Sequence, residues 1–401
     1  MSFATEFDSL ALAELSAFAR TATPGDVDAA LARGGGSRAR LADFAALVSP
    51  AAATSEYLEA MAQQAHALTA KHFGRVVRFF APLYLSNECI NICKYCGFSR
   101  DNPILRVTLT VDQAVVEARY LRDQGFRHIL LVAGEHPHFV SDGYLRDCVA
   151  RLHVDWPSIS LEVGPLETEQ YVPIVQAGAE GLVVYQETYD RTVYDAMHVS
   201  GPKKDFGWRL ETPERAYAAG FKRLGIGALL GLAPWRGEAV ALAAHTAYLL
   251  RTCWMAQLTI SVPRLRPAAG GFQPSVNVGD RELVQLVCAL RLTFPEVGLV
   301  LSTRESPKLR DHLIPLGITL MSAGSHTEPG GYTGQGREEL HVTKGGRILK
   351  PALPAIESEG EHATVQFEIA DNRTPAEVAG RLEQMGYETV WKDWEAVLSE
   401  T

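Results

Sequence analysis

The sequence predicts an α/β fold, a closed (β/α)8 barrel with a helical extension before it and a helical appendage after it. Eight short apolar, β-branched runs follow one another along the middle of the chain, and helix-like stretches lie between them. Eight is also the number of parallel strands that closes such a barrel. We therefore expect a helical extension at residues 1–75, the barrel at 76–325, and a loop or lid with a helical appendage at 326–401.

The N-terminal extension is rich in Ala and Leu at helical spacing. In "ATSEYLEAMAQQAHALTAKHFG", Leu58, Met61, Ala65 and Leu68 fall on one face of a helix. The pattern changes at Arg75, where short β-branched runs begin. The extension should therefore end where the first strand of the barrel starts.

The runs predicted as barrel strands are residues 76–84, 128–134, 158–163, 181–187, 223–230, 257–263, 298–303 and 318–323. Helix signals lie between them: Thr110, with Gln113 three positions later, predicts a capping box, and Gly125 a helix stop. After the last strand the chain becomes Gly-rich and polar, which predicts a loop or lid. The final helix should begin at Thr374, with Glu377 completing a second capping box.

Composition and charge exclude several classes of protein. The 47% hydrophobic and 21% charged residues are those of an ordinary globular protein. A net charge of -9 with no basic cluster argues against a nucleic-acid partner. The sequence has no apolar run long enough to span a bilayer, and its acidic N-terminus lacks the features of a signal peptide. We therefore expect a cytoplasmic protein that binds neither nucleic acid nor membrane.

Three cysteines crowd the loop predicted after the first strand, in "LYLSNECINICKYCGFS": Cys89, Cys93 and Cys96. A closed zinc site needs a fourth ligand, whereas a 4Fe-4S cluster held by three cysteines keeps one iron free to bind something else. Loops after barrel strands are also where active sites lie. The sequence therefore predicts a 4Fe-4S cluster, and a non-catalytic metal-binding scaffold or a redox sensor is the alternative of another class. The other cysteines lie on predicted outer helices and should be core residues: Cys148, Cys253 and Cys288.

The spacing Cys-x3-Cys-x2-Cys, with the aromatic Tyr95 just before the third cysteine, resembles the signature of the radical S-adenosylmethionine (SAM) superfamily. The resemblance implies that SAM binds the free iron and is cleaved, by an electron from the cluster, to a 5'-deoxyadenosyl radical. It also implies cofactor contacts. Tyr95 would lie near the adenine, Gly134 and Glu135 at the SAM amino group, Glu162 at the ribose and Arg209 at the SAM carboxylate.

Further blocks narrow the resemblance to the 2-iminoacetate synthase family, the tyrosine lyases of thiamine thiazole biosynthesis. The similar blocks are "LLVAGEH", "LEVGPL", "VYQETY", "RLETPERA", "SVPRLRP", "LSTRESP", "PGGY" and "VWKDW". The similarity runs from Val76 to the C-terminus, apart from residues 339–368, which look like an insertion. It implies cleavage of the Cα–Cβ bond of L-tyrosine to 2-iminoacetate and p-cresol, with thiazole synthase as a protein partner and a flavodoxin-type electron donor. Tryptophan lyase is the alternative within the same group of aromatic amino-acid lyases.

The amino-acid substrate needs anchors of its own. Arg304, at the end of the seventh predicted strand, has the planar fork that suits a carboxylate, and Ser322 on the eighth can add a hydroxyl donor. Tyr84, at the end of the first strand, is expected to contact the substrate amine. The structural alternative for Arg304 is a salt bridge on the barrel rim with Glu305 or Asp311.

Overall fold

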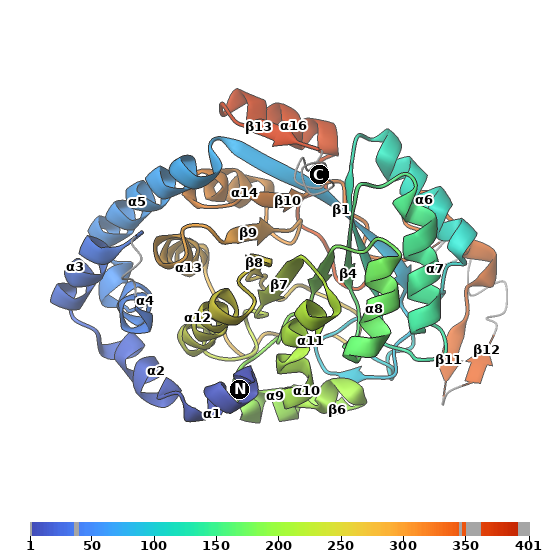
Figure 1. Ribbon diagram of the computed structural model, residues 1–401, viewed down its shortest axis with the longest axis horizontal. Helices are drawn as coiled ribbons and strands as arrows, with labels where there is room; N and C mark the ends of the chain where they lie inside the picture. Colours follow the sequence, from blue (N-terminus) through green and yellow to red (C-terminus); the bar gives the residue numbers. More distant parts are fainter. Residues whose placement is uncertain (1, 36–39, 345–346, 350–361, 392–401) are drawn as a thin grey trace.

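The predicted barrel is present in the computed structural model, which describes residues 2–35, 40–344, 347–349 and 362–391 (Figure 1). Eight parallel strands form a ring in which the last, β10, pairs with the first, β1. In ring order the strands are β1 (Val76–Ser86), β3 (His128–Ala133), β4 (Ser158–Glu162), β5 (Gly181–Val183), β7 (Arg223–Gly227), β8 (Gln257–Ser261), β9 (Gly298–Leu301) and β10 (Leu320–Ser322). Each overlaps one of the eight predicted runs, so the fold prediction is confirmed.

Side chains alternate between the two faces of the strands, as the pleat requires. On β1, Phe79, Ala81 and Leu83 join the main core between the ring and the helices outside it. Phe80 and Tyr84 belong to a second apolar cluster inside the ring. Tyr84 therefore lies inside the barrel, at the carboxyl end of its strand, where the chemistry of such folds takes place.

Helices cover the outside of the ring (Figure 1). They are α6 (Val111–Asp123), α7 (Asp142–His153), α8 (Thr168–Gln176), α11 (Thr212–Ala219), α12 (Trp235–Thr252), α13 (Asp280–Thr293) and α14 (Pro307–Leu313). The predicted capping box starts α6: the Gln113 amide donates to Thr110 Oγ1 at 3.3 Å, and the Thr110 amide donates to Gln113 Oε1 at 2.8 Å. Cys148, Cys253 and Cys288 are buried, as the sequence predicts.

The N-terminal helices form an arc along one side of the barrel, drawn in blue in Figure 1. They are α1 (Phe3–Ser9), α2 (Leu12–Thr21), α3 (Pro24–Arg33), α4 (Leu41–Leu47) and α5 (Ser55–Phe73), with a short 3-10 turn η1 (Ala51–Ala53). The face predicted for α5 is found: Leu58, Met61 and Ala65 are buried, and Leu68 packs against the same core. These helices rest on α12 and α13 of the barrel.

Further short elements lie between the βα units and after the last barrel strand. They are β2 (Ile92–Cys93), α9 (Arg191–Met197), β6 (His198–Ser200), η2 (Pro202–Lys204), α10 (Phe206–Leu210), η3 (Ile314–Leu316), η4 (Arg337–Glu339), β11 (Val342–Lys344), β12 (Arg347–Leu349), α16 (Pro375–Gln384) and β13 (Glu388–Val390). The final helix α16 starts at the predicted Thr374 cap. The following β13 was not predicted; it pairs in parallel with the start of β1. The "VWKDW" block and the stretch 339–368 lie partly outside the described residues.

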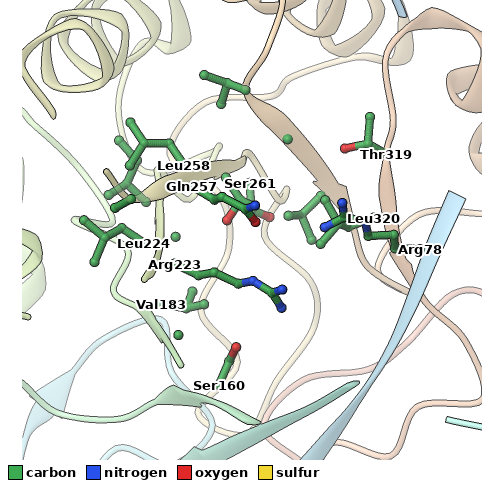
Figure 2. Close-up of a pocket in the computed structure, with 18 of the residues that line it drawn as sticks. Arg78, Ser160, Val183, Arg223, Leu224, Gln257, Leu258, Ser261, Thr319 and Leu320 are labelled. Atoms are coloured by element: carbon green, nitrogen blue, oxygen red, sulfur yellow. The ribbon is translucent and has the colours of Figure 1, made fainter. Parts of the chain in front are cut away.

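The amino-terminal half of the barrel contains a cavity. A cavity of about 540 Å³ opens among the amino-terminal parts of the strands, and Arg78, Ser160, Arg223 and Thr319 are among its lining residues (Figure 2). Most eight-stranded barrels fill this space with layers of branched side chains. Here three glycines, Gly181, Gly225 and Gly298, are also among the lining residues. In the described part of the chain, we find no helix with the length and apolarity that a membrane crossing requires.

Candidate active site

The cysteine loop connects β1 to α6 at the carboxyl end of the barrel. Its backbone is fixed from within, because the Cys93 amide donates to Ser99 Oγ at 3.2 Å and the Cys96 amide to the Cys93 carbonyl at 3.3 Å. Arg106, only 1% exposed, donates to the carbonyls of Phe98 at 3.1 Å and Ser99 at 2.8 Å. A buried cation thus holds the loop in shape through its backbone, without using any cysteine side chain.

Three free thiols gather in this loop, which is the donor set that a 4Fe-4S cluster requires. Cys96 packs in one apolar cluster with Cys89 and in another with Cys93, so the three cysteines lie near one another. Burial raises the pKa of the Cys93 thiol. Within the described residues, no three His, Cys, Asp or Glu side chains converge closely enough to hold a single metal ion. A cubane needs no such convergence, because each thiolate binds a different iron.

Gly134 and Glu135 lie against this loop, at the end of β3. A methyl group at Gly134 would lie 2.2 Å from the Glu88 carbonyl oxygen, so only glycine fits beside the cysteines. The Glu135 carboxylate accepts from Asn91 Nδ2 at 2.7 Å, and its carbonyl accepts from the Ile90 amide at 2.8 Å. Glu135 is therefore half-buried against the cysteine loop, with its second carboxylate oxygen left for another donor.

Tyr95 is buried, and its hydroxyl lies 2.8 Å from Nε2 of His198. The Nδ1 atom of His198 lies 2.8 Å from the Tyr194 carbonyl, which can only accept. Burial lowers the pKa of His198 to about 3, so the imidazole is neutral. Its single proton therefore sits on Nδ1, and Nε2 accepts from the Tyr95 hydroxyl. This chain of hydrogen bonds fixes the ring of Tyr95, which lies in the sequence between the second and third cysteines.

An ion cluster that the sequence analysis missed lies beside Tyr95. Lys203 donates to Glu187 Oε1 at 2.6 Å, and the Arg209 guanidinium lies 3.6 Å from the same oxygen. Burial acts to raise the pKa of Glu187, but these two cations hold that pKa below its ordinary value. Glu187 has a φ of 73°, the one non-glycine residue with positive φ in the described part of the chain. Such strain persists where a structure needs one side-chain direction, which is common at active sites.

The predicted substrate anchors belong to neighbouring strands of the ring: Tyr84 lies on β1, Ser322 on β10, and Arg304 follows β9. The half-buried Arg304 guanidinium stacks on the Phe367 ring, with Cζ 3.4 Å from the ring centroid. Tyr84 donates to Gln366 Oε1 at 2.8 Å. Ser322 is buried on β10 and its carbonyl accepts from Arg310, so its backbone is fixed; its predicted role as a hydroxyl donor stays a prediction.

Glu162, at the end of β4, is the carboxylate whose charge acts most strongly on Arg304. Burial raises the pKa of Glu162 to about 7, and the Arg304 cation opposes this rise without forming a salt bridge. Among the described residues, neither group has a hydrogen-bonded or ion-paired side-chain partner. Most buried polar groups in proteins are hydrogen-bonded, so two half-buried charged groups without such partners are candidates for binding a ligand.

The rim salt bridges considered as the alternative for Arg304 do not form. Glu305 pairs with Arg264 instead, accepting from its Nε at 3.0 Å. Asp311 pairs with Arg373 at 3.0 Å and with Arg381 at 2.9 Å. Both carboxylates are thus already neutralised, and Arg304 is left facing the interior of the site.

Known proteins are similar to this chain in sequence and in fold. The Radical SAM superfamily model matches residues 83–238, and the Biotin and Thiamin Synthesis associated domain model matches residues 261–388. The chain is 43% identical to the 2-iminoacetate synthase of Escherichia coli (strain K12) over 377 residues, which cover 94% of this chain and 92% of that protein. The chain belongs to the 2-iminoacetate synthase family.

Membership of this family confirms the predicted radical SAM class, and with it the predicted cofactors, a 4Fe-4S cluster and SAM. The 2-iminoacetate synthase of Salmonella typhimurium is also 43% identical, over 357 residues that cover 89% of this chain and 88% of that protein. Among solved structures, a maturase of the [FeFe]-hydrogenase, HydG, superposes with a TM-score of 0.84 at 29% identity, over 97% of this chain and 81% of that one. Methylornithine synthase, at 21% identity and a TM-score of 0.70, shares the fold over 93% of this chain and 99% of that one.

Proposed function

We propose that this protein is a radical SAM lyase that cleaves the Cα–Cβ bond of L-tyrosine to give 2-iminoacetate and p-cresol. Membership of the 2-iminoacetate synthase family supports the reaction. One observation on this chain supports an amino-acid substrate: the Arg304 guanidinium lies half-buried at the barrel mouth and has no carboxylate within salt-bridge distance among the described residues. Such a cation is an anchor for the carboxylate of a ligand.

The cofactor side of the site belongs to the cysteine loop in this proposal. Cys89, Cys93 and Cys96 would each hold one iron, and the bound cluster and SAM supply a 5'-deoxyadenosyl radical that removes a hydrogen atom from the substrate. The Glu135 carboxylate has a lone pair left for the SAM ammonium, since Asn91 uses only one of its oxygens.

Three further residues complete the proposed SAM site. The backbone around Tyr95, whose hydroxyl is already bonded to His198, would hold the adenine. The half-buried Glu162 carboxylate has no partner among the described residues, which supports its proposed bonds to the ribose hydroxyls. Arg209 shares Glu187 with Lys203 and keeps further N–H donors for the SAM carboxylate.

The substrate side is built from β1, β9 and β10. We propose that the Arg304 fork binds the carboxylate of tyrosine, that the Ser322 hydroxyl adds a donor, and that the Tyr84 oxygen accepts from the ammonium. These contacts would hold Cα beside the radical while the Cα–Cβ bond breaks. Because 2-iminoacetate hydrolyses readily, we further propose handover to thiazole synthase, and a flavodoxin-type protein as the electron donor; both rest on the family resemblance.

Product analysis tests the proposal. The protein is reconstituted with iron and sulfide, then incubated anaerobically with SAM, dithionite and either tyrosine or tryptophan. We expect tyrosine-dependent p-cresol and glyoxylate, the latter from hydrolysed 2-iminoacetate. Indole-type products from tryptophan with no p-cresol from tyrosine would replace the tyrosine assignment with the tryptophan one. A reconstituted cluster that cleaves no SAM with either amino acid would favour the scaffold or sensor.

A further inference from the structure

Residues 363–371, here called the strap, cross the carboxyl end of the barrel without forming a helix or strand. Backbone amides of the strap donate to four carbonyls of the barrel loops at 2.8–3.1 Å: those of Leu105, Thr327, Pro267 and Thr303. These acceptors follow β1, β10, β8 and β9, which are neighbours in the ring. The strap therefore covers the part of the barrel mouth that contains the substrate anchors.

Both ends of the strap are fixed. Ala363, 5% exposed, packs with Val107 and Leu340. At the other end, the fully buried Asp371 carboxylate accepts from Arg373 Nη2 at 2.7 Å and pairs with Arg310. A segment held at both ends and along its length can set the position of the side chains it carries.

Two consecutive strap residues contact the two anchors. Gln366 Oε1 accepts from the Tyr84 hydroxyl at 2.8 Å, and the Phe367 ring lies 3.4 Å from Arg304 Cζ. Phe367 also lines a surface cavity of about 590 Å³, together with Tyr120 and Leu121 of α6. The strap sits close to the cysteine loop as well, since a methyl group at Gly97 would lie 2.3 Å from the Gln366 carbonyl oxygen.

We propose that Gln366 and Phe367 are positioning residues that prepare Tyr84 and Arg304 for the two charged ends of an α-amino acid. The Phe367 face holds the guanidinium plane without using any N–H group, so all five donors stay available for a carboxylate. Gln366 Oε1 accepts the one hydrogen bond that the Tyr84 hydroxyl can donate, so the lone pairs of the Tyr84 oxygen stay available for a donor such as the substrate ammonium. The inference rests on the proposed function for the identity of the substrate as an amino acid.

Paired variants of Phe367 and Gln366 distinguish a positioning role of these side chains from a general contribution to the fold. Phe367→Leu removes the aromatic face and Phe367→Tyr keeps it; Gln366→Leu removes the acceptor and Gln366→Glu keeps it. Val365→Ala, in the same strap but 37% exposed and without contact to either anchor, is the matched control. Iron and sulfide content of each reconstituted variant checks folding. The readouts are KM for the amino acid and the p-cresol formed per 5'-deoxyadenosine.

We expect Phe367→Leu to raise KM about tenfold and to lower the product formed per 5'-deoxyadenosine, with Phe367→Tyr within about twofold of the wild type. Gln366→Leu should raise KM about fivefold alone, but not in a Tyr84→Phe background, because the hydroxyl it acts on is then absent. Unchanged KM and coupling in both Leu variants would overturn the proposal. So would additive effects in the Tyr84→Phe background, or an equal loss in Val365→Ala, because either marks a merely structural strap.

The proposed function fails separately from this inference. If the wild type forms no p-cresol from tyrosine but cleaves tryptophan, the tyrosine assignment is wrong, and the same variants are compared for KM with tryptophan. In this proposal Tyr84 and Arg304 bind only the ammonium and the carboxylate of the substrate, so the expected changes in KM are the same for either amino acid.

Discussion

Replacing Arg304 by lysine isolates what the guanidinium geometry adds beyond its charge. In the wild type the guanidinium rests on Phe367, 3.4 Å from the ring centroid, and no other side chain among the described residues pairs with it. Lysine keeps the positive charge but loses the second parallel hydrogen bond to a carboxylate, a loss of about 1.5–3 kcal/mol for a charged acceptor. Since every 1.4 kcal/mol is tenfold in affinity, KM for tyrosine should rise about 10- to 100-fold.

The assay follows p-cresol and 5'-deoxyadenosine against tyrosine concentration in anaerobically reconstituted protein. Lost substrate positioning should also lower the p-cresol formed per SAM cleaved, because a misplaced substrate leaves the radical without its target. Arg100→Lys is the matched control, since Arg100 lies in the cysteine loop with its side chain 44% exposed and paired with its neighbour Asp101. A KM for Arg304→Lys within twofold of the wild type would refute the carboxylate role of Arg304.

Three other changes test the cofactor side and the electrostatics. Alanine at any one of the loop cysteines should abolish cluster binding: Cys89, Cys93 and Cys96. Alanine at any one of the other, buried cysteines should leave the cluster bound: Cys148, Cys253 and Cys288. Iron and sulfide analysis decides this, and a full cluster in Cys93→Ala would refute it. Gly134→Ala places a methyl group 2.2 Å from the Glu88 carbonyl oxygen and should lower both the iron content and the free energy of unfolding, the latter by about 1–3 kcal/mol. In the control Gly143→Ala the methyl group lies 3.8 Å from its nearest neighbour and should change neither quantity. Thermal melts and iron assays measure both, and equal effects of the two variants would contradict the reasoning. Burial raises the pKa of Glu162 from 4.5 to about 7, so the folded protein binds this proton more tightly than the unfolded chain does, and the group lowers stability as pH rises through that window. Glu162→Gln should therefore lose less in melting temperature between pH 5 and pH 8 than the wild type, and an equal or larger loss would be evidence against this account.

The sequence could predict the ring of strands because each strand carries its own signal, a short apolar β-branched run. It could not predict β13, a strand of three residues after the last helix, because so short a run has no periodicity. Strand-end position identified Tyr84, Glu162 and Arg304, and the same rule could have identified Glu187, which ends the predicted run 181–187.

The missed contacts are those that no local pattern carries. Lys203 reaches Glu187 from a 3-10 turn, an element without a sequence period that points to a site. Gln366 meets Tyr84 across 282 positions of the chain, from a stretch that looked like part of an insertion. Such pairs arise when the barrel closes and the C-terminal segment crosses its mouth, so only the folded chain reveals them.

Three arginines at this end of the barrel show how the surroundings of a cation separate structural from binding roles. Arg264 is neutralised by Glu305, and Arg310 by Asp371. An anionic ligand could bind either of them only by competing with a carboxylate that is covalently part of the protein and already in place. Arg304 is supported by an aromatic face instead, so its charge is held in position and its donors stay unoccupied. The sequence "STRESPKLR" contains both Arg304 and Arg310 with nothing to tell them apart. The partner across the fold, Phe367 in one case and Asp371 in the other, decides which arginine fixes the structure and which one can bind a substrate.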